Sequence, residues 1–214
     1  GNLSACYVLP MEDDLEKIFK TVKDTAIIHK YGGGTGFDFS RLRPEGFHVG
    51  KTNQCASGPI SFMRVIDANT QEIKQGGKRR GANMAILRID HPDIVKFIKM
   101  KTSDDGTLTN FNISVAVTDE FMETLQKYPN EEFITYYQIR SGDKVGYTIS
   151  KETDSWNVGT EDTYTNAEIW DLIAQSAWEC ADPGLVFIDR INASMPGAYI
   201  GEKVQIRATN LFHS

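Results

Sequence analysis

Short apolar runs typical of buried strands alternate with amphipathic helical patterns along this chain. The strand-like runs lie at residues 82–90, 111–117 and 184–189. The helical patterns cover residues 13–30, 57–74, 91–101, 118–128 and 165–180. Strands separated by helices of this length usually pair in parallel, because each helix returns the chain to the same edge of the sheet. The alternation therefore predicts an α/β architecture with a parallel sheet.

The first amphipathic helix is expected over residues 13–30. Aspartates stand at its start, where the positive end of the helix dipole favours carboxylates. Apolar side chains recur at helical spacing and predict one buried face, formed by Leu15, Ile18, Phe19, Val22, Ala26 and Ile27. The next helix is expected to begin at Ser57, which can cap it, with Pro59 in the first turn. It is expected to run as far as Gly76.

Three further patterns complete the expected fold. Residues 131–150 alternate around a Ser-Gly-Asp turn and predict a β-hairpin outside the main sheet. Thr165 and Glu168 match a capping box at the start of the last long helix. Residues 184–189 predict a final buried strand. Since no internal repeat or linker interrupts these segments, a single domain over residues 1–214 is expected.

Charge and composition exclude several classes of protein. The formal net charge of -6 argues against a surface that coats nucleic acid. No apolar run reaches the roughly 18 to 20 residues of a membrane span, and no signal-peptide pattern is present. A cytoplasmic protein is predicted, without nucleic acid or membrane partners. Cys6, Cys55 and Cys180 form no disulfide framework or zinc motif, so the simplest interpretation of each is a small buried side chain, and no metal is predicted.

The glycine-rich segment YGGGTGFDFSRLRPEG, residues 31–46, has two interpretations. Glycine lets a ligand approach the backbone, and the following arginines suit phosphate. However, the run matches neither the Walker motif nor the dinucleotide fingerprint, because a helix rather than a strand precedes it and no Gly-Lys-Ser/Thr is present. By spacing alone, a tight turn between helix and strand is favoured over phosphate contact.

A second glycine-rich segment, KQGGKRRGANM at residues 74–84, interleaves basic residues with glycines. Exposed amides together with Arg and Lys side chains suit a polyphosphate or a base edge. A solvated turn between a helix and a strand explains the same residues equally well. Both interpretations remain open on the residues alone.

Four long blocks of the chain resemble the catalytic subunit of ribonucleotide reductase. They are NLSACYVLPMEDDLEKIF, GGGTGFDFSRLRPEG, ASGPISFMRVIDANTQEIKQGGKRRGANMAILRIDHPDI and NFNISVAVTDEFM. The third block is most similar to the adenosylcobalamin-dependent class II branch. Since the blocks follow the family's order over nearly the whole chain, they are far more specific than a single glycine motif.

The resemblance implies both a fold and a reaction. The fold is the first half of a ten-stranded α/β barrel, a parallel five-stranded half-barrel with flanking helices and a β-hairpin excursion. The reaction converts ribonucleotides to deoxyribonucleotides by thiyl-radical chemistry, for deoxyribonucleotide biosynthesis and DNA replication. The implied cofactor is adenosylcobalamin, whose cobalt-carbon bond would break to generate the radical. The implied partners are a ribonucleotide substrate, a deoxynucleoside triphosphate effector, a thioredoxin-type reductant and a second copy in a homodimer.

The resemblance also implies active-site residues. Cys6 corresponds to the thiol that becomes one half of the substrate-reducing disulfide. Asn210 corresponds to an active-site asparagine that hydrogen-bonds the substrate. Ala5 and Gly34, together with Cys6 and Asn210, correspond to positions that contact the ribonucleotide.

A separate group of residues corresponds to the allosteric specificity site. Asp13 begins the helix that in the family packs at the dimer interface and binds the effector. Arg43 corresponds to a position near the effector's phosphates. Residues 74–83 correspond to the loop that senses the effector base and relays it to the substrate, with Gln75, Lys78 and Arg79 as the candidate contacts.

The end of the sequence departs from the family's pattern. After Asn210 the family continues with Pro-Cys-Gly-Glu or a close variant, whereas this sequence reads Leu-Phe-His-Ser. Phe212 stands where the radical-forming cysteine belongs, and no residue replaces the glutamate that acts as general base. We therefore expect a fragment that does not reduce nucleotides by itself.

Three alternatives remain open. The chain could come from a class I large subunit, whose radical is supplied by a separate metal-containing protein. It could be a truncated module that binds a deoxynucleotide without catalysis. It could also be a soluble α/β domain with no ligand, whose glycine segments are plain turns.

Overall fold

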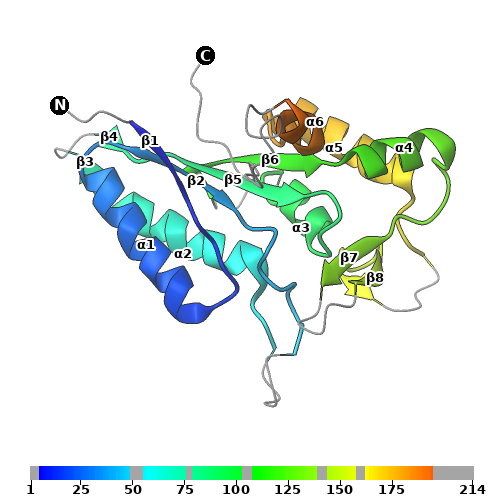
Figure 1. Ribbon diagram of the computed structural model, residues 1–214, viewed down its shortest axis with the longest axis horizontal. Helices are drawn as coiled ribbons and strands as arrows, with labels where there is room; N and C mark the ends of the chain where they lie inside the picture. Colours follow the sequence, from blue (N-terminus) through cyan, green and yellow to red (C-terminus); the bar gives the residue numbers. More distant parts are fainter. Residues whose placement is uncertain are drawn as a thin grey trace. The chain divides into compact units, whose positions relative to one another are not determined.

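The computed structural model describes residues 5–48, 55–75, 79–102, 108–138, 144–157 and 162–194. Its main sheet is parallel and has five strands in the order β1-β2-β5-β6-β10 (Figure 1). These strands are β1 (Cys6–Leu9), β2 (Gly34–Asp38), β5 (Asn83–Arg88), β6 (Phe111–Val117) and β10 (Gly184–Phe187). The predicted five-stranded parallel sheet is confirmed.

Helices lie between the strands, as the alternation predicted. They are α1 (Leu15–Lys30), α2 (Gly58–Glu72), α3 (Ile94–Lys99), α4 (Asp119–Lys127), α5 (Asn166–Cys180) and α6 (Ile188–Ala193). Ser57 occupies the N-cap of α2 but makes no capping hydrogen bond with its side chain. The expected extension of α2 to Gly76 is wrong, because the backbone of Ile73 turns to an extended conformation and β3 begins at Lys74.

Two antiparallel groups of strands accompany the main sheet. The first is a hairpin of β3 (Lys74–Gln75) and β4 (Arg79–Arg80). The second joins β7 (Thr135–Gln138), β8 (Lys144–Ile149) and β9 (Trp156–Asn157). The hairpin predicted at residues 131–150 is therefore confirmed. The segment predicted as a loop at 74–84 contains a short hairpin.

The chain divides into two compact units. Within the described residues, one unit contains most of residues 5–86 together with 108–114, and the other contains 87–102 with most of 115–194. Phe37, Phe39 and Phe111 pack in the first unit with ring centroids 5.8 to 6.4 Å apart, and all three are buried. In Figure 1, α1 and α2 of this unit lie side by side.

The second unit has its own core and its own polar anchors. Phe121 and Phe133 meet edge to face with centroids 5.8 Å apart. Lys99 on α3 bonds both carboxylate oxygens of Asp154 at 2.8 Å and the hydroxyl of Tyr164 at 3.0 Å. These bonds attach the segment after β8 to α3.

A capping box begins α5, as the sequence predicted. The Thr165 side chain accepts a hydrogen bond from the backbone of Glu168, whose carboxylate accepts one from the Thr165 backbone at 2.8 Å. Two helix-terminal N–H groups are thus satisfied by side chains close in sequence. This explains why the local pattern was sufficient to locate the start of α5.

The predicted buried face of α1 is confirmed only at Ile18 and is wrong for Leu15, Phe19 and Ile27. Its buried residues are Ile18, Thr21, Thr25 and His29, whereas Leu15, Phe19 and Ile27 are 62%, 51% and 45% exposed. Polar side chains can be buried here because they are hydrogen-bonded. Thr21 donates to the carbonyl of Pro10 and Thr25 to that of Thr21, both at 2.8 Å. The buried face of α1 is therefore largely polar, and half of the six apolar residues predicted to be buried are exposed.

Other burial expectations also need correction. β10 was predicted as buried, but Leu185 and Phe187 are 39% and 41% exposed because β10 stands at the end of the strand order. Cys55 is exposed, while Cys6 and Cys180 are half-buried, so none is a fully buried core residue. Among the described residues, no helix combines the length and apolar character needed to cross a membrane.

Candidate functional site

Three of the predicted substrate-contacting residues lie together at the start of the sheet. Cys6 is the first residue of β1 and pairs in register with Gly34, the first residue of β2. The Gly34 amide donates a hydrogen bond to the carbonyl of Ala5 at 2.8 Å. Cys6 is half-buried, and its neighbour Gly34 has no side chain to crowd the thiol.

The glycines of residues 32–34 have distinct structural roles. Gly32 follows α1 with φ of 96°, a left-handed conformation that glycine adopts without strain. A β-carbon on Gly33 would lie 2.5 Å from Cγ2 of Ile28 and 3.3 Å from the carbonyl of Ala5. The turn interpretation therefore accounts for Gly32, and close packing accounts for Gly33. Phosphate contact by this run stays a prediction.

Asp13 and Arg43, predicted at the effector site, form an ion pair. Arg43 Nη2 lies 2.7 Å from Asp13 Oδ2, and Nε lies 2.8 Å from the same oxygen and 3.1 Å from Oδ1. Both side chains are about a quarter exposed or less, at 20% for Arg43 and 27% for Asp13. A bidentate pair of this kind fixes the plane of the guanidinium. The two residues are 30 positions apart in sequence, so the fold places them together.

A cavity of about 270 Å³ opens beside this ion pair. Its lining includes Asp13 and Arg43, the first residues of α1, and the start of α2 at Ser57 and Gly58. The positive ends of two helix dipoles therefore meet at one cavity next to an arginine. Asp14 satisfies an amide of α1 by accepting from Lys17 at 3.0 Å, while α2 has no equivalent side-chain cap.

Sequence reasoning missed the contribution of α2 to this cavity. Ser57 was assigned only as a helix cap, and Gly58 and Phe62 were assigned no ligand contact. Gly58 has φ of 74°, so glycine lets the chain turn sharply into α2 here. The signal that was available is the Ser-Gly-Pro helix start, since helix starts bind anions. Phe62 carries no sequence signal for this role.

The remaining predicted residues are only partly described. Gln75 and Arg79 are paired across the β3–β4 hairpin, and Lys74 is paired with Arg80. Only their backbone arrangement is given by the structure. Lys78 and Asn210 lie outside the described residues, as does Phe212. The roles expected for all these residues stay predictions.

A buried polar network lies at the base of the same hairpin. His29 Nε2 is 3.1 Å from Oγ1 of Thr35, which donates to Oδ1 of Asn83 at 2.7 Å. Asn83 in turn donates to Oγ1 of Thr70 at 3.0 Å. All four residues are fully buried, and burial lowers the pKa of His29 below its ordinary value. This network joins α1, β2, α2 and β5.

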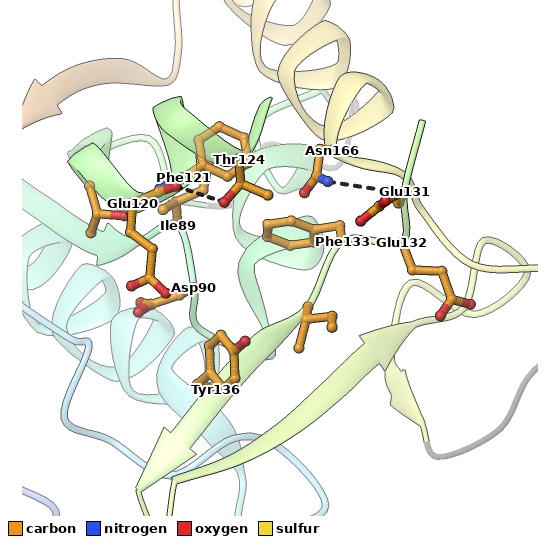
Figure 2. Close-up of a pocket in the computed structure, with 12 residues that line it drawn as sticks. Ile89, Asp90, Glu120, Phe121, Thr124, Glu131, Glu132, Phe133, Tyr136 and Asn166 are labelled. Carbon is orange, nitrogen blue, oxygen red and sulfur yellow. Dashed lines mark hydrogen bonds between the residues drawn. The ribbon is translucent and has the colours of Figure 1, made fainter. Parts of the chain in front are cut away.

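A second cavity, of about 140 Å³, lies within the other unit (Figure 2). Its apolar lining includes Phe121, Phe133 and Tyr136, and its carboxylates belong to Asp90, Glu120, Glu131 and Glu132. Asp90 is paired with Arg88, whose Nη2 lies 2.7 Å from the carboxylate. Among the described residues predicted to act on a nucleotide, none lines this cavity.

The parallel sheet with its flanking helices is half of an α/β barrel. The family model described as the ribonucleotide reductase barrel domain matches residues 4–212. The chain therefore belongs to the ribonucleotide reductase family, as its sequence blocks indicated.

Similar proteins agree with this assignment. The chain is 49% identical over 210 residues to a vitamin B12-dependent ribonucleoside-diphosphate reductase of Thermoplasma acidophilum. It is 37% identical to a protein of the same description from Mycobacterium tuberculosis. Both alignments cover 98% of this chain but only 24% and 27% of those relatives. The chain thus spans about a quarter of their length.

A solved structure shows the same fold. The Actinobacillus ureae class Id ribonucleotide reductase alpha subunit superposes with a TM-score of 0.69 at 21% identity. The match covers 97% of this chain and 31% of that subunit. At this identity the likeness establishes the architecture alone.

Proposed function

We propose that this chain forms the first part of the catalytic barrel of a ribonucleotide reductase. The complete reaction replaces the ribose 2′-hydroxyl by hydrogen and releases water, while two thiols are oxidised to a disulfide. Cys6 supplies one of these thiols in our proposal. Its half-buried position at the start of β1, beside Gly34, supports this role. The names of the similar proteins favour a ribonucleoside diphosphate as substrate.

Other elements of the complete site fall on residues that the structure does not describe. We propose that Asn210 hydrogen-bonds the substrate, and that the radical-forming thiol and the general base are not supplied by Phe212 or its neighbours. The chain alone is then inactive, which keeps a nucleotide-binding module as the alternative function. We also propose that its two units belong to one barrel domain of a cytoplasmic enzyme, which a thioredoxin-type reductant returns to the dithiol state.

The similar proteins are named as vitamin B12-dependent. We therefore propose that adenosylcobalamin, rather than a separate class I radical subunit, is the source of the radical in the complete enzyme. When bound, this cofactor supplies the radical that starts the reaction. The described cavities of about 270 and 140 Å³ do not fit a corrin ring system with its nucleotide tail. The cofactor would therefore be held by residues other than those lining these two cavities.

The observation that carries the allosteric part of the proposal is the cavity beside Arg43. Two helix starts and a guanidinium face the same space of about 270 Å³. Such a group favours the phosphates of a nucleotide. Asp13 supports the proposal by holding Arg43 in a fixed orientation. We propose that the phosphates of a deoxynucleoside triphosphate bind here, and that Gln75, Lys78 and Arg79 respond to its base.

A deoxynucleoside triphosphate should therefore stabilise the folded chain. At about 100 times its dissociation constant, one bound nucleotide raises the free energy of unfolding by roughly 2.7 kcal/mol. The change is measured as a rise in melting temperature with each of the four triphosphates. Arg43→Ala should weaken binding about tenfold or more, because a hydrogen bond to a charged group contributes roughly 1.5–3 kcal/mol.

Arg190→Ala is the matched control for Arg43→Ala. Arg190 also forms an ion pair, with Asp119 at 2.9 Å, but it lines neither described cavity. Its removal should leave nucleotide stabilisation unchanged. If none of the triphosphates raises the melting temperature of the folded, dimeric protein, the effector site proposed here is wrong.

We also propose that the protein forms a homodimer through the exposed face of α1. An exposed apolar stripe is formed by Leu15, Phe19 and Ile27. The buried face of the helix carries Thr21 and Thr25, whose hydroxyls donate hydrogen bonds within the same chain. A second copy of the same face would cover this stripe and would place two effector cavities near the interface, since α1 begins at the cavity. The family resemblance, in which this helix packs at the dimer interface, supports the same surface.

Phe19→Asp should convert the dimer to a monomer, because a desolvated carboxylate without a partner is strongly unfavourable in an apolar interface. Sedimentation velocity at one protein concentration measures the change. Trp178→Asp is the control, since Trp178 is 90% exposed but lies on α5. Dissociation by Trp178→Asp and not by Phe19→Asp would assign the interface to another surface.

A further inference from the structure

The imidazole of His29 lies directly against Gly81, where the chain leaves the β3–β4 hairpin for the sheet. A β-carbon on Gly81 would lie 2.5 Å from both Cγ and Nδ1 of His29 and 2.8 Å from Cδ2. Carbon atoms in packed interiors do not approach ring atoms so closely. Residue 81 must therefore be glycine while the imidazole occupies this place. The requirement is one of space, because the backbone of Gly81 is not left-handed.

Hydrogen bonds fix the orientation of the imidazole. The hydroxyl of Thr35 donates to Asn83, so it must accept from His29, and Nε2 therefore carries the ring hydrogen. Nδ1 is then a lone-pair nitrogen, and it is buried without a hydrogen-bond partner among the described residues. An unpaired buried nitrogen is unfavourable, so stability alone does not explain a histidine at this position. Its ring faces Gly81 on the side of this nitrogen.

The same contacts fix three consecutive residues after β4. Gly81 lies against the ring of His29. The carbonyl of Ala82 accepts from the Thr35 amide at 3.1 Å, and Asn83 accepts from the Thr35 hydroxyl at 2.7 Å. Contacts from α1 and β2 therefore fix the position of the backbone where the β3–β4 hairpin joins β5.

α1 connects this place to the proposed effector cavity. The helix begins at the cavity beside Asp13 and Asp14 and carries His29 in its last turn. It has 16 residues, which corresponds to a rod of about 24 Å. Because a packed helix moves largely as one body, a displacement at its first turn is transmitted to the imidazole.

We propose that His29 is a positioning residue for substrate specificity, which acts by setting where the chain passes from β4 through Gly81 into β5. The inference rests on the proposed function, in which residues 74–83 relay the identity of the effector to the substrate. His29 touches neither nucleotide and acts through its contact with Gly81 and its hydrogen bond to Thr35. In this arrangement a displacement of α1 moves the imidazole, and the contact between the imidazole and Gly81 moves the end of the β3–β4 hairpin.

A double-mutant cycle in the full-length enzyme tests this contact. Gly81→Ala should disturb the junction because its methyl group overlaps the ring, and His29→Ala should loosen it by removing the ring. In the variant with both changes, the junction should return toward its wild-type arrangement, because the new methyl group then occupies space vacated by the imidazole. His29→Gln keeps a hydrogen-bond donor without the flat ring, and should behave like His29→Ala.

Two measurements are made on each variant. The first is the change that each deoxynucleoside triphosphate produces in the relative kcat/KM of the four ribonucleotide substrates, which should fall on the order of tenfold in each single variant. The second is hydrogen exchange at residues 80–84, which should accelerate by a similar factor and return toward the wild-type rate in the double variant. Gly146→Ala is the control, since Gly146 lies in β8 of the second unit, where its β-carbon would lie 3.0 Å from Cγ2 of Ile134.

The two measurements separate this proposal from the proposed function. If the wild-type enzyme shows no effector-dependent preference, the proposed allosteric function fails, and hydrogen exchange alone decides whether His29 positions the junction. Unchanged exchange in Gly81→Ala and His29→Ala overturns the positioning role. Faster exchange with an undiminished effector response shows that the contact is structural and overturns its role in specificity.

Discussion

Cys6→Ser in the full-length enzyme is expected to abolish steady-state deoxyribonucleotide formation with a dithiol reductant. Serine cannot form the disulfide that accepts the oxidising equivalents, so each turnover lacks one of its two reducing thiols. A loss of at least about a thousandfold is expected, which corresponds to roughly 4 kcal/mol in the activation barrier. The amount of deoxynucleotide formed is measured by chromatography under saturating substrate and cofactor.

The geometry of the strand end explains why the effect should be specific to Cys6. Cys6 is the first residue of β1 and pairs in register with Gly34, in the group predicted to contact the ribonucleotide. Cys180→Ser is the matched control, since Cys180 Sγ lies 3.2 Å from the carbonyl oxygen of Ser176 and 3.3 Å from that of Asp182, and a serine hydroxyl keeps a donor there. Full activity in Cys6→Ser would show that both reducing thiols lie elsewhere in the enzyme.

Phe37→Ala is expected to lower the free energy of unfolding of the isolated chain by about 3–5 kcal/mol. Phe37 is fully buried, and its ring centroid is 5.8 Å from that of Phe39 and 6.2 Å from that of Phe111. Truncation would remove apolar surface from the centre of this aromatic group and leave a cavity. Urea denaturation followed by circular dichroism measures the change.

Phe187→Ala provides the matched control for the core prediction. The same atoms are removed, but Phe187 is 41% exposed in this chain. A change less than half as large as that of Phe37→Ala is therefore expected. Equal losses from both variants would indicate that the rings near β2 are not the main source of stability in their unit.

The sequence predicted those parts of the fold that depend on residues close together in the chain. The capping box of α5 involves only Thr165 and Glu168, and it lies where the pattern placed it. The strands β5 and β6 were predictable because most of their residues are apolar and lie close together in the sequence. The family resemblance predicted that Cys6 and Gly34 contact the same ligand, and the parallel register of β1 and β2 places these residues side by side.

Features that depend on distant residues were not predictable. The face of α1 that packs inward is chosen by hydrogen bonds from Thr21 and His29 to residues outside the helix, which apolar periodicity does not detect. Likewise, the cavity beside Arg43 requires the start of α2, a contribution visible only when the chain is folded. Gly81 was interpreted as one glycine of a loop, although its position depends on an imidazole 52 positions earlier in the sequence.

The inverted orientation of α1 makes its two faces respond differently to temperature. In the proposed dimer, burial of the outward face with Phe19 would be driven by a hydrophobic effect that weakens on cooling. The inward face is attached by hydrogen bonds such as that from Thr21 to Pro10, which do not share this dependence. Cold would thus loosen the proposed association through α1 while the helix stays attached to its own unit, so that dimer formation could be measured separately from folding without any mutation.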